Sequence, residues 1–239
     1  MNIRPDLLIF GVVLIFAGIM LTMIQKTKKA RVTKTLRAQK LGFEPLELTP
    51  PDFLSRIEDL FQNERNKTLE IRGFFHRKDL ERDYYLFDLV DTDDEDTWLG
   101  TEMFGVISRN LALPRFSLTT IPAFDRQKTI GSLMDKMLDK VMDLAAKYQD
   151  LNRIEFPENP GLDEKVVVFG RDEIAVGNLL SRISLDFFTQ SKTPLQLYGS
   201  GDCLIVDGSF TVTSKNQEMN LENLFQLTED LVRAFEGSS

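Results

Sequence analysis

The strongest constraint in this sequence is an uncharged apolar run near its N-terminus. Residues 7–24 are 18 consecutive positions without a charged side chain. A helix rises about 1.5 Å per residue, so this run is close to the ~30 Å thickness of a membrane's hydrocarbon core. The residues before the run hold one basic side chain, Arg4, and no small-residue cleavage site follows it, which argues against a cleaved signal peptide. The sequence therefore predicts a transmembrane anchor over residues 1–24.

A basic stretch follows the predicted span. Residues 25–40 contain no acid and seven basic side chains: Lys26, Lys28, Lys29, Arg31, Lys34, Arg37 and Lys40. Because Lys and Arg close to a span stay on the cytoplasmic side, we expect the N-terminus outside and the rest of the chain in the cytosol, at the inner (plasma) membrane. Basic side chains near an anionic leaflet contribute about 1 kcal/mol each. We therefore interpret residues 25–40 as a basic juxtamembrane linker, with all of these side chains except Lys40 as candidate membrane-surface contacts.

The remaining residues, 41–239, have the opposite charge. Residues 1–40 hold 8 of the 29 basic and 1 of the 37 acidic side chains, which leaves 21 basic and 36 acidic residues and a net charge of −15. An acidic body repels a phosphate backbone, so nucleic-acid binding is excluded as a function. The single cysteine, Cys203, excludes an intramolecular disulfide and fits a reducing compartment. We expect residues 41–239 to form one acidic cytoplasmic domain.

Strand-like segments alternate with helix-like segments along this domain. A helix is predicted to begin near Pro51, with an apolar face made of Phe53, Leu54, Ile57, Leu60 and Phe61. Segments rich in β-branched and aromatic residues follow at 68–75, 84–90, 97–108, 115–121, 154–156, 165–170, 195–199, 203–208 and 210–213. The short connections between the first four of these segments indicate antiparallel pairing. We therefore predict an α+β domain with a mainly antiparallel sheet and helices packed on one face.

Three further helices are predicted from apolar periodicity. Residues 130–148 repeat apolar side chains at three- and four-residue spacing, and a second helix is expected from Asp172 to about Thr189. The last runs from Leu221 to Phe235, capped by Asn220, with six inward-facing side chains: Leu221, Leu224, Phe225, Leu231, Val232 and Phe235. All three fit helices that bury an apolar stripe against the sheet.

A cluster of acids between two strand-like segments is the one candidate for cation chemistry. We call residues 91–102, DTDDEDTWLGTE, the acidic hairpin. Aligned with a calcium loop, Asp91, Asp93 and Glu95 occupy the first liganding positions and Glu102 the last. Asp96, however, stands where such a loop needs glycine, and strands flank the segment on both sides. A solvated hairpin tip is the favoured interpretation, and a divalent-cation site on Asp91, Asp93, Glu95 and Glu102 is the alternative.

The other chemistry-bearing residues exclude several classes of site. His76 is the only histidine and lies at a strand end beside Arg77 and Lys78, so a histidine-based triad is not indicated. One histidine and one cysteine cannot build a zinc site, and Cys203 is expected to be a small buried hydrophobe at a strand start. YGSGDC and VVVFGRDE lack the pattern of a phosphate loop and are interpreted as turns. In the second turn, Asp172 and Glu173 are expected to cap the helix that follows. No cofactor is expected beyond the candidate cation.

Three motifs together resemble a family. ALPRFSLTTI, RIEFPENPGLDEKVVVFGRDEIAVGNLLSRISLDFF and LQLYGSGDCLIVDG, spread over residues 112–208, are similar to segments of a group of uncharacterised bacterial membrane proteins. Those proteins have a short N-terminal span, a basic stretch and a cytoplasmic α+β domain. The resemblance covers roughly residues 40–236. It implies a fold and a topology but no activity, so no site residue follows from it.

These observations favour a membrane-tethered, non-catalytic cytoplasmic module that binds a protein or a small ligand, since a tether raises effective concentration near membrane partners. The alternative is a metal-dependent enzyme or a regulatory cation-binding domain built on the acidic hairpin. A third and minor hypothesis is that the predicted span packs against another membrane helix. Its small-residue face for such packing is weak and consists of Ala17, Gly18, Leu21 and Thr22.

Overall fold

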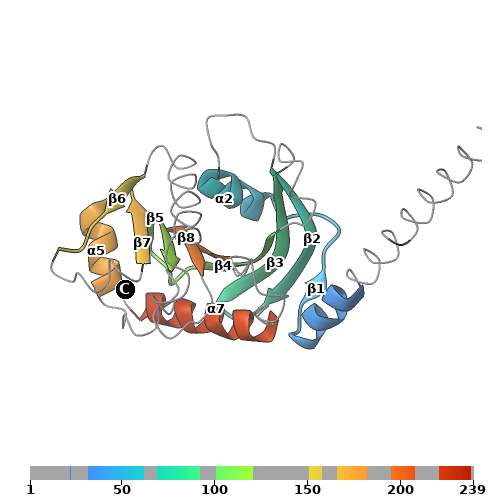
Figure 1. Cartoon of the computed structure of the whole chain (residues 1–239). Coiled ribbons are helices and arrows are strands. Elements are labelled where there is room, and N and C mark those ends of the chain that lie inside the picture. Colours follow the sequence, from blue (N-terminus) through green and yellow to red (C-terminus); the bar gives the residue numbers. More distant parts are fainter. Residues whose placement is uncertain are drawn as a thin grey trace, which may run out of the picture. The chain divides into compact units, whose positions relative to one another are not determined.

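A computed structural model gives the structure of the chain (Figure 1). It describes residue 22 and residues 32–61, 69–91, 101–120, 151–157, 166–181, 195–207 and 221–237. The chain divides into two compact units, Met1–Gly42 and Phe43–Ser239. In the first unit, residues 32–40 form a helix. It ends in a turn where the Gly42 amide donates to the Gln39 carbonyl at 3.0 Å, and Gly42 has a φ of 81°, which suits a helix C-terminus.

The predicted transmembrane span lies outside the described residues, apart from Thr22. So does most of the small-residue face considered for pairing of that span. Of the helices in the described ranges, none has both the length and the apolar character needed to cross a membrane.

The second unit is built on one antiparallel sheet. Within the described residues its strands are β1 (Glu44–Pro45), β2 (Leu69–Lys78), β3 (Arg82–Asp91), β4 (Thr101–Ser108), β5 (Leu113–Thr120), β6 (Asn152–Ile154), β7 (Val166–Gly170), β8 (Gln196–Gly201) and β9 (Cys203–Asp207). Their order across the sheet is β1-β2-β3-β4-β9-β8-β5-β7-β6, and each neighbouring pair is antiparallel. The α+β class and the antiparallel sheet are therefore confirmed. The predicted strand at 210–213 and the predicted helix at 130–148 lie outside the described residues.

Helix α2 (Pro51–Phe61) covers one face of the sheet (Figure 1). It begins at the predicted proline, where the Leu54 amide donates to the Pro50 carbonyl at 3.0 Å. Phe53, Ile57 and Leu60 are buried at helical spacing, as the sequence predicts. Of the other two residues predicted for this face, Leu54 is 37% exposed and Phe61 is half-buried. Phe53 stacks on Tyr85 of β3, with ring centroids 4.1 Å apart. Full burial of an aromatic side chain of this kind stabilises the fold by about 1.5–3 kcal/mol.

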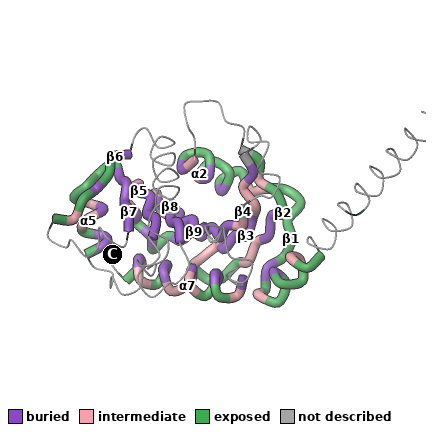
Figure 2. Tube along the Cα trace, viewed as in Figure 1, coloured by how far each residue is buried: buried purple, intermediate pink, exposed green. Residues whose placement is uncertain are grey.

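Helix α7 (Leu221–Glu236) covers the opposite face. All six side chains predicted to face inward are buried, and Thr228 is buried with them. The Phe225 ring lies 5.4 Å from the ring of Tyr84, which precedes Tyr85 in β3. Consecutive strand residues point to opposite faces, so Tyr84 and Tyr85 place α7 and α2 on opposite sides. Figure 2 shows the same layering, with buried central strands between helices whose outer sides are exposed.

The prediction that the helices pack on one face is therefore wrong. Helix α5 (Glu173–Ser181) shares the α7 side, since its Val176 packs where a side chain at Gly170 would otherwise project. Helix α2 alone of these three covers the other face. The physical reason is visible in β7 and β9, in which every residue is buried. A strand that is apolar without alternation needs cover on both faces.

The order of the central strands also differs from a simple chain of hairpins. The short connection after β4 indicated that β5 pairs with it, but the β8–β9 hairpin lies between them. Two glycines allow close packing on the two faces. A Cβ at Gly105 of β4 would lie 2.7 Å from the Phe53 ring, and a Cβ at Gly199 of β8 would lie 2.3 Å from the Phe116 ring. Small residues at these positions therefore let aromatic rings from other elements reach the sheet.

Candidate functional site

The most unusual feature of the domain is a set of buried polar side chains on its central strands. We call Ser117, Thr119, Gln196 and Asp207 the polar row; their exposed fractions are 0%, 1%, 2% and 4%. Thr119 of β5 is the cross-strand partner of Gln196 of β8, and Gln196 is the partner of Asp207 of β9. Ser117 lies two residues before Thr119 and so points to the same face. The row crosses three adjacent strands, which are spaced about 4.8 Å apart.

The polar row lies on the α2 face, beyond the C-terminal end of that helix. Tyr198 marks the boundary: it belongs to the apolar core under α2, and the ring of Phe61 packs edge-on against it at 4.7 Å. Gln196 is two residues from Tyr198 on the same strand face. At this end of the sheet β5 and β9 end and β8 begins. The row is therefore a polar continuation of the apolar α2 core.

Three atoms of the polar row are left without a hydrogen bond. Within the described part of the chain, Ser117 Oγ, Thr119 Oγ1 and Gln196 Nε2 are buried and lack a partner. Thr120, the next residue, makes the contrast: its hydroxyl accepts a hydrogen bond from the Leu195 amide at 2.7 Å on the other face. A buried polar group without a partner costs about 1–3 kcal/mol. Three such groups close together therefore make the polar row a destabilising part of the core.

The second candidate surface is the helix at residues 32–40. Val32 and Leu36 are 59% and 56% exposed although both are apolar. They are four residues apart and therefore lie on one side of the helix. Lys40, four residues after Leu36, is exposed on the same side, and Arg37 is exposed next to it, whereas Ala38 is buried. The exposed surface thus combines two aliphatic side chains with two positive charges, as in helices that lie at a membrane interface. Of the predicted membrane-surface residues, Lys34 and Arg37 belong to this helix, and Lys26, Lys28, Lys29 and Arg31 lie outside the described residues.

The acidic hairpin is confirmed as the connection between two antiparallel neighbours. β3 ends at Asp91 and β4 begins at Thr101, and Leu89 pairs with Thr101. Glu102 is described in β4, opposite Asp88, whereas Asp93 and Glu95 lie outside the described residues. Among the residues that are described, no group of three acids, histidines or cysteines is placed to hold a metal ion. The candidate cation site on Asp91, Asp93, Glu95 and Glu102 stays a prediction.

The single histidine and the single cysteine are both packed against neighbouring residues of the fold. His76 lies within β2, where its Nε2 is 2.8 Å from Asp83 Oδ1 and its ring stacks on Tyr85. Cys203 is fully buried at the start of β9, as predicted. Burial, together with the nearby Asp202 carboxylate, raises the pKa of the Cys203 thiol to about 12. At neutral pH this thiol is therefore protonated and a poor nucleophile.

Ion pairs attach helix α2 to the strands beneath it. Arg56 donates to both carboxylate oxygens of Asp202 in the β8–β9 turn, at 2.7 and 2.6 Å. The Arg56 guanidinium thereby holds the pKa of the Asp202 carboxyl below its ordinary value. Further along α2, Asp59 accepts a hydrogen bond from Arg115 of β5 at 3.3 Å. The loop YGSGDC, predicted to be a turn, is therefore a hairpin that anchors α2.

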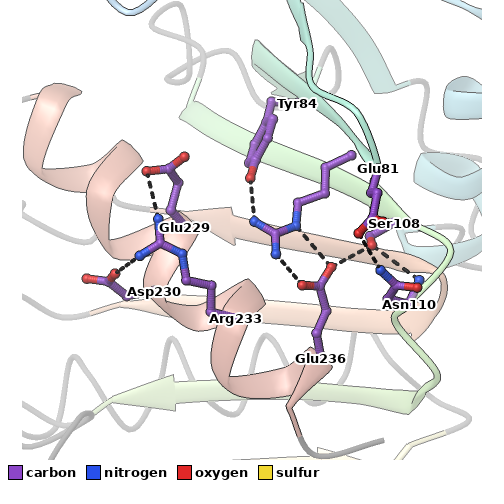
Figure 3. Close-up of polar contacts among 9 residues, drawn as sticks. Glu81, Tyr84, Ser108, Asn110, Glu229, Asp230, Arg233 and Glu236 are labelled. Atoms are coloured by element: carbon purple, nitrogen blue, oxygen red, sulfur yellow. Dashed lines mark hydrogen bonds and ion pairs between the residues drawn. The ribbon is translucent and has the colours of Figure 1, made fainter.

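A second polar network attaches the C-terminal end of helix α7 (Figure 3). Arg82 of β3 donates through Nε to Glu236 Oε1 at 3.0 Å and through Nη2 to Oε2. Ser108 of β4, the cross-strand partner of Arg82, donates to Glu236 Oε1 at 2.6 Å. Arg82 also reaches the Tyr84 hydroxyl at 3.3 Å. Helix α7 is thus fixed at its end by charge and along its length by apolar packing.

The turn before α5 is also structural, as predicted. Asp172 accepts a hydrogen bond from the Ala175 amide at 3.0 Å, which is the geometry of a helix N-cap. The acid therefore occupies the helix end that a phosphate would otherwise use.

The polar row was not predicted from the sequence. The segment RFSLTTI is predicted to be a strand, but its pattern does not single out Ser117 or Thr119. No local signal marks them, because their burial follows from the position of β5 between β8 and β7 in the sheet.

Comparisons with known proteins do not assign this chain to a family. No family model matches it, and no curated protein matches it. A search of solved structures finds the crystal structure of the mycobacterial trehalose monomycolate transport factor A, TtfA, with 10% sequence identity and a TM-score of 0.45. The match covers 84% of this chain and 93% of that chain. A likeness at this level does not define a class or a function.

Proposed function

We propose that this chain is a membrane-tethered binding module, held by one N-terminal span, whose acidic α+β domain binds a ligand or a partner protein in the cytosol without catalysing a reaction. The single observation that supports it most is the helix at residues 32–40. It follows a basic stretch and exposes Val32 and Leu36 beside Arg37 and Lys40. Such a surface is expected next to an anionic leaflet.

The charge distribution supports the same arrangement. Every charged side chain in residues 25–40 is basic, whereas residues 41–239 carry a net charge of −15, from 21 basic and 36 acidic residues. An anionic membrane therefore attracts the linker and repels the domain. Repulsion keeps the domain free to meet partners, while the tether keeps it near them.

A binding role rather than a catalytic one is supported by how the domain uses its charged side chains. Arg56, Arg82 and Arg115 each pair with a carboxylate on another element and fix α2 or α7 to the sheet. The one thiol is buried and protonated at neutral pH. These arginines hold helices on the sheet, and the thiol is part of the core.

The membrane contact can be tested with a polarity-sensitive dye. The full chain carrying Leu36→Cys is labelled and reconstituted in phosphatidylcholine vesicles with and without phosphatidylglycerol. Cys203 is fully buried, so the dye reports position 36. We expect a blue-shifted emission in the anionic vesicles that is reduced by salt, since surface attraction is screened over about 10 Å at 0.1 M.

The control is Leu80→Cys, at a fully exposed position in the β2–β3 turn, whose dye should respond equally in both vesicles. Adding Arg37→Glu and Lys40→Glu to the labelled chain should abolish the shift at position 36. Equal spectra in the two kinds of vesicle, with the dye solvent-exposed in both, would show that the helix does not contact lipid and would remove the main support for the proposal.

A further inference from the structure

We propose that the first part of the acidic domain is a docking surface for a basic amphipathic helix that borders the membrane span of another protein. The surface, which we call the acidic leucine surface, combines apolar and acidic side chains that are all exposed: Leu46, Leu48, Leu54, Glu44, Glu47 and Asp52. Among the described residues of the second unit, five large apolar side chains are exposed. Three of the five belong to this surface, so its leucines are a cluster rather than scattered single residues.

The three leucines are brought together by one aromatic contact. The Leu46 amide donates to the Phe74 carbonyl at 3.0 Å, which continues the pairing of β1 with β2. The centroid of the Phe74 ring lies 5.5 Å from that of Phe53, the residue before Leu54 in α2. Leu48 is 83% exposed on the chain that connects β1 to α2 along the edge of the sheet (Figure 1). The leucines therefore form one surface at this edge.

The carboxylates of the surface have no basic partner among the described residues. Residues 44–59 hold five acids and one base, Arg56, and that guanidinium is already bound to a carboxylate of the β8–β9 turn. No described Lys, Arg or His side chain pairs with the carboxylate of Glu44, Glu47 or Asp52. Such a surface repels an anionic leaflet and complements a partner that is both positive and apolar.

The edge of the sheet favours a docked helix over an added strand. β1 is the last strand on its side of the described sheet. The Leu46 amide points toward β2, and amides alternate along a strand, so the position of Pro45 faces outward. Proline has no amide hydrogen to donate there, which blocks strand addition. Side-chain contacts remain, and the leucines suit the apolar stripe of an amphipathic helix whose Lys and Arg side chains meet the carboxylates.

The choice of a membrane protein as the partner rests on the proposed function. Leu46 comes six positions after Lys40 in the sequence, and six residues of chain span at most about 20 Å. A lipid contact by residues 32–40 would therefore hold the acidic leucine surface near the leaflet. Cytoplasmic segments that border a membrane span are rich in Lys and Arg. A neighbouring membrane protein thus offers the charge that this surface complements.

The test uses the full chain in phosphatidylcholine nanodiscs and a short fluorescent peptide as the probe. The peptide has leucine at three- and four-residue spacing and lysine at most other positions, and a control peptide has glutamate in place of every lysine. Fluorescence anisotropy measures binding, with empty nanodiscs as the background. We expect saturable binding of the lysine peptide only, and we expect it to weaken as salt is added.

Variants of the surface should weaken binding of the lysine peptide. Leu48→Ala removes its most exposed apolar side chain and should raise the Kd roughly fivefold. Glu47→Lys combined with Asp52→Lys replaces attraction by repulsion and should raise the Kd roughly tenfold. Because all three positions are exposed, the melting temperature of the chain should stay unchanged.

The matched controls lie in the β2–β3 turn. Leu80 is fully exposed between Asp79 and Glu81, so it has the same local chemistry without neighbouring leucines. Leu80→Ala should leave the Kd unchanged. Asp79→Lys combined with Glu81→Lys changes the net charge as much as the surface variant does and should change the Kd by less than roughly twofold.

Four results would overturn the inference. Binding no stronger than to empty nanodiscs would mean that the surface takes no basic helix. Equal weakening by the two charge reversals would mean diffuse attraction to an acidic domain. Association between copies of the chain that Leu48→Ala abolishes would make the occupant a second copy. A dye on Leu48→Cys that shifts to the blue in anionic vesicles would make the surface a lipid contact. None of these results alters the spectrum of the dye at position 36, so the proposed function and this inference can fail separately.

Discussion

Replacing Glu236 should show how strongly the end of helix α7 is held. Its carboxylate accepts two hydrogen bonds from Arg82 and one from Ser108. The Arg82 and Glu236 side chains are 20% and 11% exposed, and Ser108 is fully buried. Glu236→Ala therefore leaves a mostly buried guanidinium and a buried hydroxyl without their acceptor.

Removing one partner of a fully buried ion pair costs about 3–5 kcal/mol, and an exposed pair contributes about 0–1 kcal/mol. The partial exposure of this pair places the expected loss between these limits, at about 2–3 kcal/mol. For a chain of this size, that corresponds to a decrease in melting temperature of about 4–12 °C. Differential scanning fluorimetry of the full chain in detergent measures it directly.

Arg233→Gln is the matched control on the same helix (Figure 3). Arg233 contacts Glu229 and Asp230 at 3.7 and 3.5 Å but is 59% exposed, so its loss should cost less than about 0.5 kcal/mol. A Glu236→Ala variant that melts within a degree or so of Arg233→Gln would refute the reasoning. The network at the end of α7 would then contribute no more than a surface ion pair.

Three further outcomes are expected. The pKa of the Asp202 carboxyl is lower in the folded state than in the unfolded state, so its pair with Arg56 stabilises the fold above about pH 4 and is lost as the pH falls further. Arg56→Met should therefore lower the free energy of unfolding by about 1 kcal/mol at pH 7, allowing for solvent screening. A loss of stability that is as large at pH 2.5 as at pH 7 would contradict this. Gly199→Ala should destabilise the fold by about 1–3 kcal/mol, because its Cβ would lie 2.3 Å from the Phe116 ring. Gly177→Ala in α5 has open space around the new Cβ and should not destabilise the fold. Equal melting temperatures of the two variants would contradict this expectation. Millimolar calcium, magnesium or manganese should leave the melting temperature of the full chain unchanged, whereas an increase of several degrees that neutral amide substitutions in the acidic hairpin abolish would establish a cation site there.

The helices that pack on the sheet were predictable where apolar spacing is decisive. In α7, six apolar side chains recur at helical intervals between polar ones, and all six are buried. In α2, a proline fixes the first turn and three apolar residues follow at helical spacing. Local periodicity carries this information, because it depends only on residues within a few turns of one another.

The placement of those elements was not predictable by the same reasoning. The insertion of β8 and β9 between β4 and β5 depends on contacts between residues far apart in the sequence, such as Phe116 and Gly199, which are 83 positions apart. Loop length suggested a β4–β5 hairpin, but tertiary packing separated them. The two-faced cover of the sheet was visible in principle in β7 and β9, whose buried runs lack alternation.

The candidate sites also divide into residues that the local sequence predicts and residues that only strand pairing brings together. Cys203 as a buried residue and Asp172 as a helix cap follow from local context, and both predictions are confirmed. The polar row depends on register: Thr119, Gln196 and Asp207 come from three segments and meet only when the strands pair. A sequence without an alignment gives no warning of such a meeting, because each residue by itself is an ordinary strand residue.

The measurement that tests the account most directly is the sidedness of the domain in intact cells. Leu80 is fully exposed and Cys203 is fully buried, so Leu80→Cys provides one accessible thiol on the domain. A membrane-impermeant maleimide should label it only after the cells are permeabilised, and the chain should stay in the membrane fraction after an alkaline carbonate wash. Labelling in intact cells, or release of the chain by the wash, would contradict a cytoplasmic domain held by an N-terminal span.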